Sequence, residues 1–392
     1  MMGEYLRSGY TTGTCASAAA RAAAVFLLTG NVPKQVSVLL GNGTVAEFTP
    51  EYGKHWCRVK KDGGDDPDVT DGVWVYAGVF PASREAFEEL CRNGRGYTLE
   101  EYEGLYLNGG LGIGIATKRG LSCPTGHYAI NPVPRRMILE AVDSVRRETF
   151  CEGCFEVRIA VPQGGELAKK TFNPVLGIKG GISVLGTTGV VEPMSEQALV
   201  ETIRLDIRVR AAAGEKNLLL TPGNYGEEFL CQELGIQLGT AVKCSNFVEA
   251  SVRMALEEGV CRLLLVGHAG KMIKVAGGVG NTHSKYGDRR MEMMERLTRQ
   301  VCTEGCEKTK EQESREIFFK EIGACNTTEE AVERLKERGL AVQVLDCAAE
   351  RVREQISRWS GGKIKGEVVM FSSLHKVVGK TKNAEDFLGL FR

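Results

Sequence analysis

The sequence has no excess of charge of either sign. Its 392 residues carry 50 lysines and arginines against 50 aspartates and glutamates, so the formal net charge at pH 7 is zero. Proteins that coat nucleic acid or bind anionic membranes through charge need a basic excess. We therefore expect no nucleic-acid partner and no membrane partner. A small polyanionic ligand is compatible with this balance, because it needs only a local cluster of cations.

The sequence also lacks an apolar run of about 18 residues, the length that predicts a transmembrane helix. The nearest approach, residues 16–28, is interrupted by Arg21 and is not followed by a signal-peptide cleavage pattern. It predicts an alanine-rich buried helix. The 13 cysteines are an odd number spread over a long chain, which argues against a secreted disulfide scaffold and favours a reducing cytosol. We expect a cytoplasmic protein.

Several common site motifs are missing. The Gly379-Lys380-Thr381 run lacks the first glycine of a P-loop, and Gly110, Gly112 and Gly114 are followed by Thr117 where a dinucleotide fingerprint needs glycine or alanine. No HExxH or Gly-x-Ser-x-Gly run occurs. Cys151 and Cys154 have the spacing of a zinc half-site but no second pair nearby, so we expect no metal site. The acidic residues at 65, 66 and 68 fit a divalent-metal site less well than an acidic turn.

Glycine is abundant, at 48 residues, which indicates many tight turns. The length predicts more than one domain. Up to residue 192 we expect an α+β domain, in which a helix at 135–150 packs on short strands at 36–40, 45–48, 57–61, 73–77 and 155–161. From residue 193 we expect an α/β domain with a mostly parallel sheet, because strands at 217–220, 241–245 and 261–266 alternate with helices. Residues 182–185 and 340–345 are further predicted strands, and 367–371 is the last.

The second half carries the candidate site. Ligands of parallel sheets bind at the carboxyl ends of the strands, where the loops at 221–226, 244–246 and 267–271 fall. The simpler alternative for each loop is a glycine turn that only reverses the chain. Histidine is scarce, at five residues. His127, His268 and His283 lie in polar or glycine-rich loops, where each can act as a general acid or base or merely brace its loop.

Taken together, seven segments resemble the CbiD family, the cobalt-precorrin-5B C1-methyltransferases of anaerobic cobalamin biosynthesis. They are residues 9–21, 63–70, 129–138, 186–198, 220–226, 243–248 and 266–284, in the order in which the family has them. The resemblance implies methyl transfer from S-adenosylmethionine to carbon C1 of a tetrapyrrole whose cobalt belongs to the substrate. It also implies a two-domain fold, with an α+β N-terminal domain and an α/β C-terminal domain. We expect the first domain to contact the tetrapyrrole and the second to contact S-adenosylmethionine.

We assign the site residues from these segments and from the charges beside them. The expected cofactor contacts are Thr221, Gly223, Asn224, Asn246, Gly267 and Gly270. The expected substrate contacts are Thr11, Thr12, Thr14, Lys60, Asp65, Asp66, Arg135, Lys271 and Lys274. The expected acid–base residues are His268, His283 and His127. No acidic residue ends the strand at 241–245, where common methyltransferases hold the ribose, so a cofactor site elsewhere stays an alternative.

Two other functions stay open. One is a corrinoid carrier without enzymatic activity, although the sequence lacks the Asp-x-His-x-x-Gly run of many cobalamin-binding modules. The other is a phosphate-handling enzyme, suggested by glycine loops at the starts of helices. The sequence also leaves a homo-oligomer open.

Overall fold

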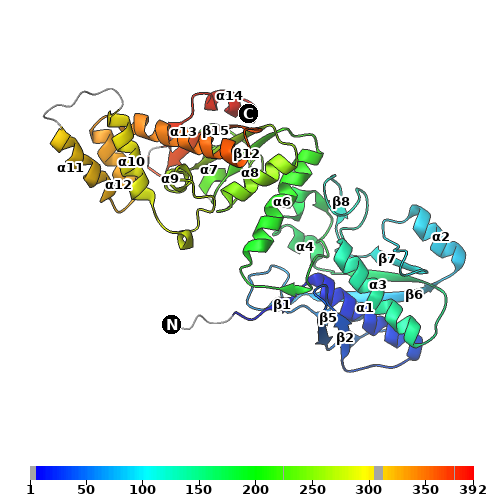
Figure 1. Cartoon of the computed structure of the whole chain (residues 1–392). Helices are drawn as coiled ribbons and strands as arrows, with labels where there is room; N and C mark the ends of the chain where they lie inside the picture. The colour runs from blue at the N-terminus through cyan, green and yellow to red at the C-terminus, as the bar shows by residue number, and fades with distance from the viewer. Residues whose placement is uncertain (1–5, 224, 304–311, 375) are drawn as a thin grey trace. The chain divides into compact units, whose positions relative to one another are not determined.

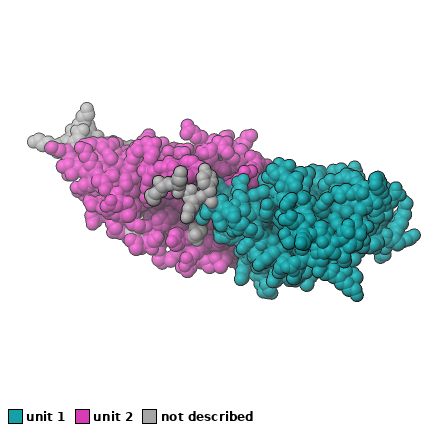
Figure 2. Space-filling view, turned by 90° about the horizontal axis from the view of Figure 1, so that it is seen from below, with its two compact units in different colours: residues 1–196 teal, residues 197–392 magenta. Residues whose placement is uncertain are grey.

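The structure, a computed structural model, describes residues 6–223, 225–303, 312–374 and 376–392. The chain is a mixed α/β protein with several sheets. It divides into two compact units, residues 1–196 and 197–392 (Figure 2). Each unit has a hydrophobic core of its own. The first unit has one cluster of buried residues, and the second has two clusters, one on each face of its sheet.

The first unit is built on a five-stranded sheet in the order β4-β5-β6-β9-β7. Its strands are β4 (Glu51–Tyr52), β5 (Cys57–Lys60), β6 (Trp74–Ala82), β9 (Cys154–Ala160) and β7 (Leu105–Gly109). All neighbours are antiparallel except β7 and β9. The sequence predicted β5 and β9 to within a residue, but it shortened β6 and missed β7.

Two long helices cover one face of this sheet (Figure 1). They are α1 (Thr12–Thr29) and α3 (Pro132–Glu148). The alanines of α1 let its backbone approach α3 and the sheet closely, and nearly all of them are fully buried. By length and composition α1 alone among the described residues could cross a membrane, but 67% of it is buried inside the fold. The alanine-rich run at 16–28 is therefore a core helix, as predicted.

Short elements complete the first unit. Residues 182–185 form only isolated bridges, Ile113 with Ile182 and Ile130 with Val184, rather than the predicted strand. The small pairs are β1 (Gly9–Tyr10) with β11 (Val190–Val191), β2 (Val36–Leu39) with β3 (Val45–Phe48), and β8 (Ile115–Ala116) with β10 (Ile178–Lys179). The remaining helices are α2 (Arg84–Asn93), α4 (Gly164–Ala168) and α5 (Asn173–Leu176).

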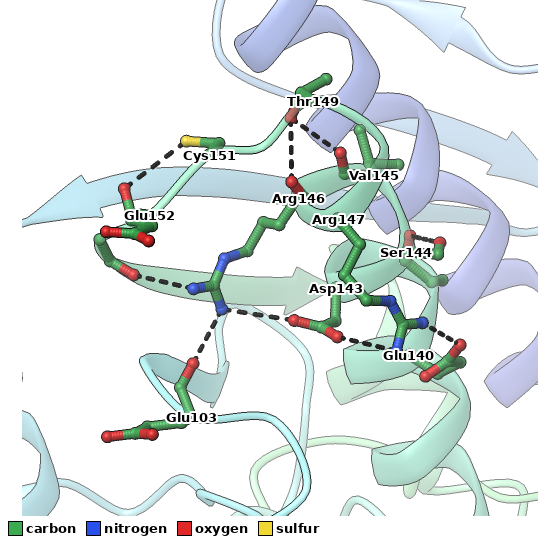
Figure 3. A network of polar contacts seen from close by, with 12 residues as sticks. Glu103, Glu140, Asp143, Ser144, Val145, Arg146, Arg147, Thr149, Cys151 and Glu152 are labelled. Carbon is green, nitrogen blue, oxygen red and sulfur yellow. Dashed lines mark hydrogen bonds and ion pairs between the residues drawn. The ribbon is translucent and has the colours of Figure 1, made fainter.

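A polar network fixes the end of α3 (Figure 3). Arg146 donates to the carbonyl oxygens of Glu103 at 2.8 Å and Gly153 at 3.2 Å. The Asp143 carboxylate bridges two arginines, with Oδ1 lying 3.5 Å from Arg146 Nη1 and Oδ2 lying 3.4 Å from Arg147 Nη1. Helix α3 is thereby tied to the turns that enter β7 and β9. The Cys151–Cys154 segment thus belongs to a hydrogen-bonded turn, and both thiols are free.

The second unit is built on a sheet in the order β13-β12-β14-β15-β16. Its strands are β12 (Asn217–Thr221), β13 (Val242–Lys243), β14 (Arg262–His268), β15 (Lys365–Ser372) and β16 (Lys376–Lys380). The first three pairings are parallel, and β16 runs antiparallel to β15, so the sheet is mixed. Strand β14 is central and almost entirely buried, as its run of leucine and valine requires.

Helices of this unit cover the sheet or, in the case of α10, α11 and α12, pack mainly on other helices (Figure 1). They are α6 (Glu196–Ala212), α7 (Tyr225–Leu234), α8 (Val248–Glu257), α9 (Ala269–Ala276), η1 (Ser284–Tyr286), α10 (Arg290–Thr303), α11 (Gln312–Gly323), α12 (Thr328–Glu337), α13 (Ala341–Trp359) and α14 (Ala384–Leu388). The strand predicted at 340–345 is wrong, because these residues begin α13. Ala341, Val344, Leu345 and Ala348 recur at helical spacing and are buried on one face.

Candidate functional site

The parallel strands bring the predicted loops to one edge of the second sheet. Strands β12, β13 and β14 run in the same direction, so their carboxyl ends lie side by side. The backbone N–H of Cys244 after β13 donates to the carbonyl of Thr221 at the end of β12. Helix α9 starts at the same edge, directly after β14. Of the six predicted cofactor residues, Asn224 lies outside the described residues.

Lys271, in the first turn of α9, joins these loops. Its Nζ donates to Asn246 Oδ1 at 2.8 Å and to the Ser245 carbonyl at 3.4 Å. The loop after β12 also reaches this ammonium group: a Cβ built on Gly223 would lie only 3.0 Å from the Lys271 Nζ. Gly223 also has φ of +86°, which disfavours other residues. The three loops therefore meet around one ammonium group.

Lys274 lies one turn further along α9 and is 9% exposed. Its Nζ has a 3.4 Å hydrogen bond to the Thr282 carbonyl, and Thr282 Oγ1 lies 3.2 Å from Asn246 Oδ1. We call Lys271, Lys274, Asn246 and Thr282 the lysine cluster. Neither lysine pairs with a carboxylate within the part of the chain that the structure describes. Burial, opposed by Cys244 and reinforced by Lys274, lowers the pKa of Lys271.

Two partly buried cations that no carboxylate of the described chain contacts directly are costly for a protein unless an anion joins them. The cluster therefore has the chemistry of a site for a carboxylate or another small anion. Thr221 adds a fully buried Oγ1 without a hydrogen-bond partner in the described chain, pointing toward Gly226 at the start of α7. Gly267 is needed for packing, since a Cβ there would lie 2.6 Å from Met272 Sδ.

His268 ends β14 and caps α9. Its Nδ1 accepts a hydrogen bond from the Gly270 N–H at 3.2 Å, so the proton of the neutral ring sits on Nε2. Nε2 lies 3.3 Å from Glu329 Oε1 and 3.2 Å from Ser373 Oγ. Burial lowers the pKa of His268, against the opposing effect of Glu329. In this arrangement His268 is a neutral hydrogen-bond donor, and its basic nitrogen is occupied by the helix cap.

The other two candidate histidines lie in different surroundings from His268. His283 is exposed, and its Nδ1 accepts from the Lys285 N–H and caps η1, directly after Thr282 of the lysine cluster. His127 belongs to the first unit, where its ring centroid lies 5.6 Å from that of Tyr97. Its buried Nδ1 has no hydrogen-bond partner among the described residues. An acid–base role for any of the three stays a prediction.

The predicted substrate contacts of the first unit are mostly engaged in holding loops. Thr11 caps α1, and Thr14 Oγ1 donates to the Gly189 carbonyl at 2.7 Å; Thr12 between them is buried. Asp65 accepts from the Arg7 N–H at 2.6 Å, and Asp66 accepts from the Met194 N–H at 3.0 Å. These contacts explain why the segments at 9–21 and 63–70 are rich in threonine, aspartate and glycine.

Arg135 and Lys60, the two predicted cationic contacts of the first unit, differ in whether the side chain already has partners. Arg135 Nε donates to the Ile130 carbonyl at 2.6 Å, and its guanidinium lies 3.5 Å from the Tyr97 ring centroid. Lys60 ends β5, is exposed and has no partner among the described residues. Lys60 is therefore free to meet a ligand, whereas Arg135 is occupied by its own unit.

Sequence reasoning missed Glu329, Ser373 and Thr282, which the structure places against the candidate residues His268 and Asn246. Glu329 and Ser373 lie 61 and 105 positions after His268 in the sequence, and only the fold brings them to it. Thr282 lies inside the segment at 266–284, so that segment was a signal for it. No group of three or more histidine, cysteine, aspartate or glutamate residues suited to a metal ion occurs among the described residues.

The fold and this edge define a two-unit α/β protein with a cationic strand edge suited to a small anionic ligand. The chain belongs to the CbiD family, as the resemblance predicted. The family model described as CbiD matches residues 1–193, and that of the CbiD C-terminal domain matches residues 281–382.

Curated relatives extend over nearly the whole chain. The cobalt-precorrin-5B C(1)-methyltransferase of Ruminiclostridium cellulolyticum is 39% identical, covering 95% of this chain and 91% of the relative. The protein of the same name from Photorhabdus laumondii is 36% identical, with coverage of 100% and 97%. A crystal structure of a cobalamin biosynthesis protein (cbiD) from Archaeoglobus fulgidus is 30% identical over 69% of this chain and 80% of that chain, with a TM-score of 0.38.

Proposed function

We propose that this chain methylates C1 of cobalt-precorrin-5B to give cobalt-precorrin-6A in anaerobic cobalamin biosynthesis. The methyl donor is S-adenosylmethionine, and cobalt enters only as part of the tetrapyrrole substrate. The observation that carries this proposal is the identity of 34–39% over nearly full length with relatives that bear this methyltransferase name. The reaction belongs in the cytoplasm, where both reactants are small soluble molecules.

The lysine cluster supports an anionic reactant at the second unit. Lys271 and Lys274 would each contact a carboxylate, and the tetrapyrrole and S-adenosylmethionine both carry carboxylates. Thr221, Gly223, Asn246, Gly267 and Gly270 would lie against S-adenosylmethionine through the same edge. Binding an anion there would remove the cost of the two unpaired cations, which favours the occupied state.

The methyl transfer itself needs positioning more than a side-chain nucleophile. The electron pair comes from the macrocycle, the methyl–sulfur bond breaks, and sulfur leaves as the neutral thioether of S-adenosylhomocysteine. Holding the two reactants in line accounts for about 7–11 kcal/mol of barrier lowering in well-oriented systems. His268 fits this role as a neutral ring whose Nδ1 accepts a hydrogen bond from the Gly270 N–H and so fixes the start of α9, the helix that carries Lys271 and Lys274.

A panel of ligands tests the proposal against its rivals. S-adenosylmethionine should raise the melting temperature, and ATP should not, because binding to the folded state stabilises it. S-adenosylhomocysteine should form only when cobalt-precorrin-5B is also present. A tetrapyrrole that binds while S-adenosylmethionine has no effect would indicate a carrier. Stabilisation by ATP alone would indicate a phosphate-handling enzyme. Either result would refute the proposal.

A further inference from the structure

The second face of the first unit's sheet carries aromatic and cationic side chains. Helices α1 and α3 pack on the face that holds Val75, Ala77 and Val79, all buried. Side chains alternate along a strand, so Trp74, Tyr76 and Phe80 point to the other face. These three aromatic residues of β6 are only half-buried. The sheet therefore presents part of its second face to the surroundings.

Four of these side chains form one block. The register pairs Lys60 with Trp74 and Arg58 with Tyr76 across β5 and β6. The Arg58 guanidinium lies 4.2 Å from the Trp74 ring centroid and 5.7 Å from that of Tyr76, and it donates to the Tyr76 hydroxyl at 2.8 Å. We call Arg58, Lys60, Trp74 and Tyr76 the aromatic–cation patch.

The contacts within the patch hold its shape. Stacking on Trp74 and the hydrogen bond to Tyr76 fix the plane of the Arg58 guanidinium. Its acidic partner, Glu51 at 2.6 Å, has a side chain that is 52% exposed, so the ion pair is open to exchange with another carboxylate. Lys60 has no partner among the described residues. The patch thus offers one cation whose ion pair is exposed to solvent and one cation without a partner among the described residues, beside two aromatic side chains.

The aromatic surface continues along β6. The Trp56 and Phe80 rings lie 5.7 Å apart, and the Arg158 guanidinium lies 5.3 Å from the Phe80 centroid. Arg158 differs from Arg58 because both oxygens of the nearly buried Glu156 hold it, at 2.8 and 2.9 Å. The available positive charge is therefore concentrated at the Lys60 end of the face.

That end leads into the loop at 63–70, one of the segments that identify the family. Lys61 follows Lys60, is 2% exposed and donates to Asp68 Oδ2 at 2.6 Å. Asp71 accepts from the Gly63 N–H at 2.7 Å. These contacts hold the loop firmly against the end of β5. The patch therefore lies beside a rigid part of the unit.

We propose that the aromatic–cation patch is the docking surface for the tetrapyrrole in the first unit. Flat aromatic faces suit the π-system of the macrocycle, while Lys60 and Arg58 suit its peripheral carboxylates. The wide ring of the macrocycle matches the two aromatic faces, and its several carboxylates match the two cations. This inference rests on the proposed function only for the identity of the macrocycle. Glu51 is the group that an incoming carboxylate displaces.

Intrinsic fluorescence tests the docking surface directly. Two of the three tryptophans, Trp56 and Trp74, lie on this face, and Trp359 is buried in the second unit. In a Trp359→Phe background, we would titrate the full chain with cobyrinic acid, a stable cobalt corrinoid with free carboxylates. Saturable quenching that weakens as salt rises is expected. Dicyanocobinamide, whose side chains are amides, should bind at least ~10-fold more weakly, which is ~1.4 kcal/mol.

Variants identify the residues responsible. Arg58→Met and Lys60→Met should each weaken cobyrinic acid binding about 5- to 20-fold, whereas Arg84→Met, an exposed arginine on α2, should not. Circular dichroism and melting temperature confirm that each variant is folded. Unchanged affinity in both patch variants, or quenching by S-adenosylmethionine instead of the corrinoid, would overturn the proposal. A dimer that the patch variants dissociate would assign the face to a second copy and overturn it as well.

Turnover separates this inference from the proposed function. The patch variants should raise KM for cobalt-precorrin-5B and leave KM for S-adenosylmethionine unchanged. An unchanged tetrapyrrole KM would refute the docking surface while leaving the methyltransferase intact. Patch-dependent corrinoid binding without any methyl transfer by the wild type would refute the methyltransferase and leave the docking surface standing.

Discussion

At the scale of single residues, Lys271 and Lys274 form the part of the strand edge that we propose binds an anion. Both side chains are at least partly buried and have no carboxylate partner among the described residues. The folded state lowers the pKa of Lys271, chiefly through burial, so the protonated side chain favours the unfolded state at neutral pH. This penalty holds at pH values below the lowered pKa. Such a cost is typical of a residue kept for a ligand.

Replacing Lys271 by methionine separates the two effects. Lys271→Met removes the buried charge but keeps an unbranched side chain, so the free energy of unfolding should change by less than ~1 kcal/mol, or rise. Affinity for S-adenosylmethionine or the tetrapyrrole should fall at least ~10-fold, because a charged hydrogen bond is lost. Calorimetric binding and urea unfolding measure the two quantities.

Lys336→Met on the exposed side of α12 is the matched control, and it should change neither quantity. Strong destabilisation by Lys271→Met together with full ligand affinity would show that Lys271 is a structural residue only.

His268 makes a pH-dependent prediction. Its pKa in the folded protein should lie below the ordinary value of about 6.5, because burial disfavours the imidazolium. The stabilising effect of the neutral ring is therefore complete above about pH 6.5 and is lost as the pH falls below it. NMR titration of the histidine resonances, assigned by their loss in His268→Gln, measures this pKa. A midpoint above 7 would contradict the neutral helix cap described here.

At the scale of elements, local sequence patterns predicted the elements whose signal is local. Alternating apolar residues located β5 and β9, and the alanine run located α1. The strand at 340–345 failed because a short apolar run suits a strand and a helix start equally well. Strand β7 was missed because its pairing with β9 depends on residues about 50 positions away. Pairing across such distances is decided by the fold and not by local propensity.

Arg146 tests how α3 is held. Arg146→Leu removes hydrogen bonds to the carbonyls of Glu103 and Gly153, leaving both without this partner. The free energy of unfolding should fall by about 1–3 kcal/mol, whereas Arg84→Leu on the exposed side of α2 should change it by less than ~0.5 kcal/mol. Equal urea midpoints for these two variants would mean that the network in Figure 3 contributes nothing.

At the scale of the whole molecule, two buried free cysteines report on the packing of the two units, Cys15 on the first and Cys244 on the second. Burial raises the pKa values of the Cys15 and Cys244 thiols to about 12, so neither forms a thiolate near neutral pH. Iodoacetamide at pH 8 should alkylate the exposed Cys231 and Cys261 first. Cys15 and Cys244 should react only after unfolding. Mass spectrometry of peptides maps the order, and early labelling of Cys244 would show that the lysine cluster is more open than described.

The site as a whole could be predicted only in part. Parallel strands place their carboxyl ends together, so the loops around Thr221, Asn246 and His268 were predictable as one edge. Glu329 and Ser373 were not, because α12 and β15 reach His268 only through tertiary packing. The first unit shows the same limit: Arg58 and Trp74 stack because β5 and β6 pair, and neither residue belongs to a recognisable motif.

The central claim is the methylation of C1, and the position of the new methyl carbon tests it most directly. We would incubate the full chain anoxically with cobalt-precorrin-5B and ¹³C-methyl S-adenosylmethionine and analyse the product by mass spectrometry and ¹³C NMR. The account predicts one labelled methyl per macrocycle, attached to C1. A label on another carbon, or none although both reactants are shown to bind the folded protein, would contradict it.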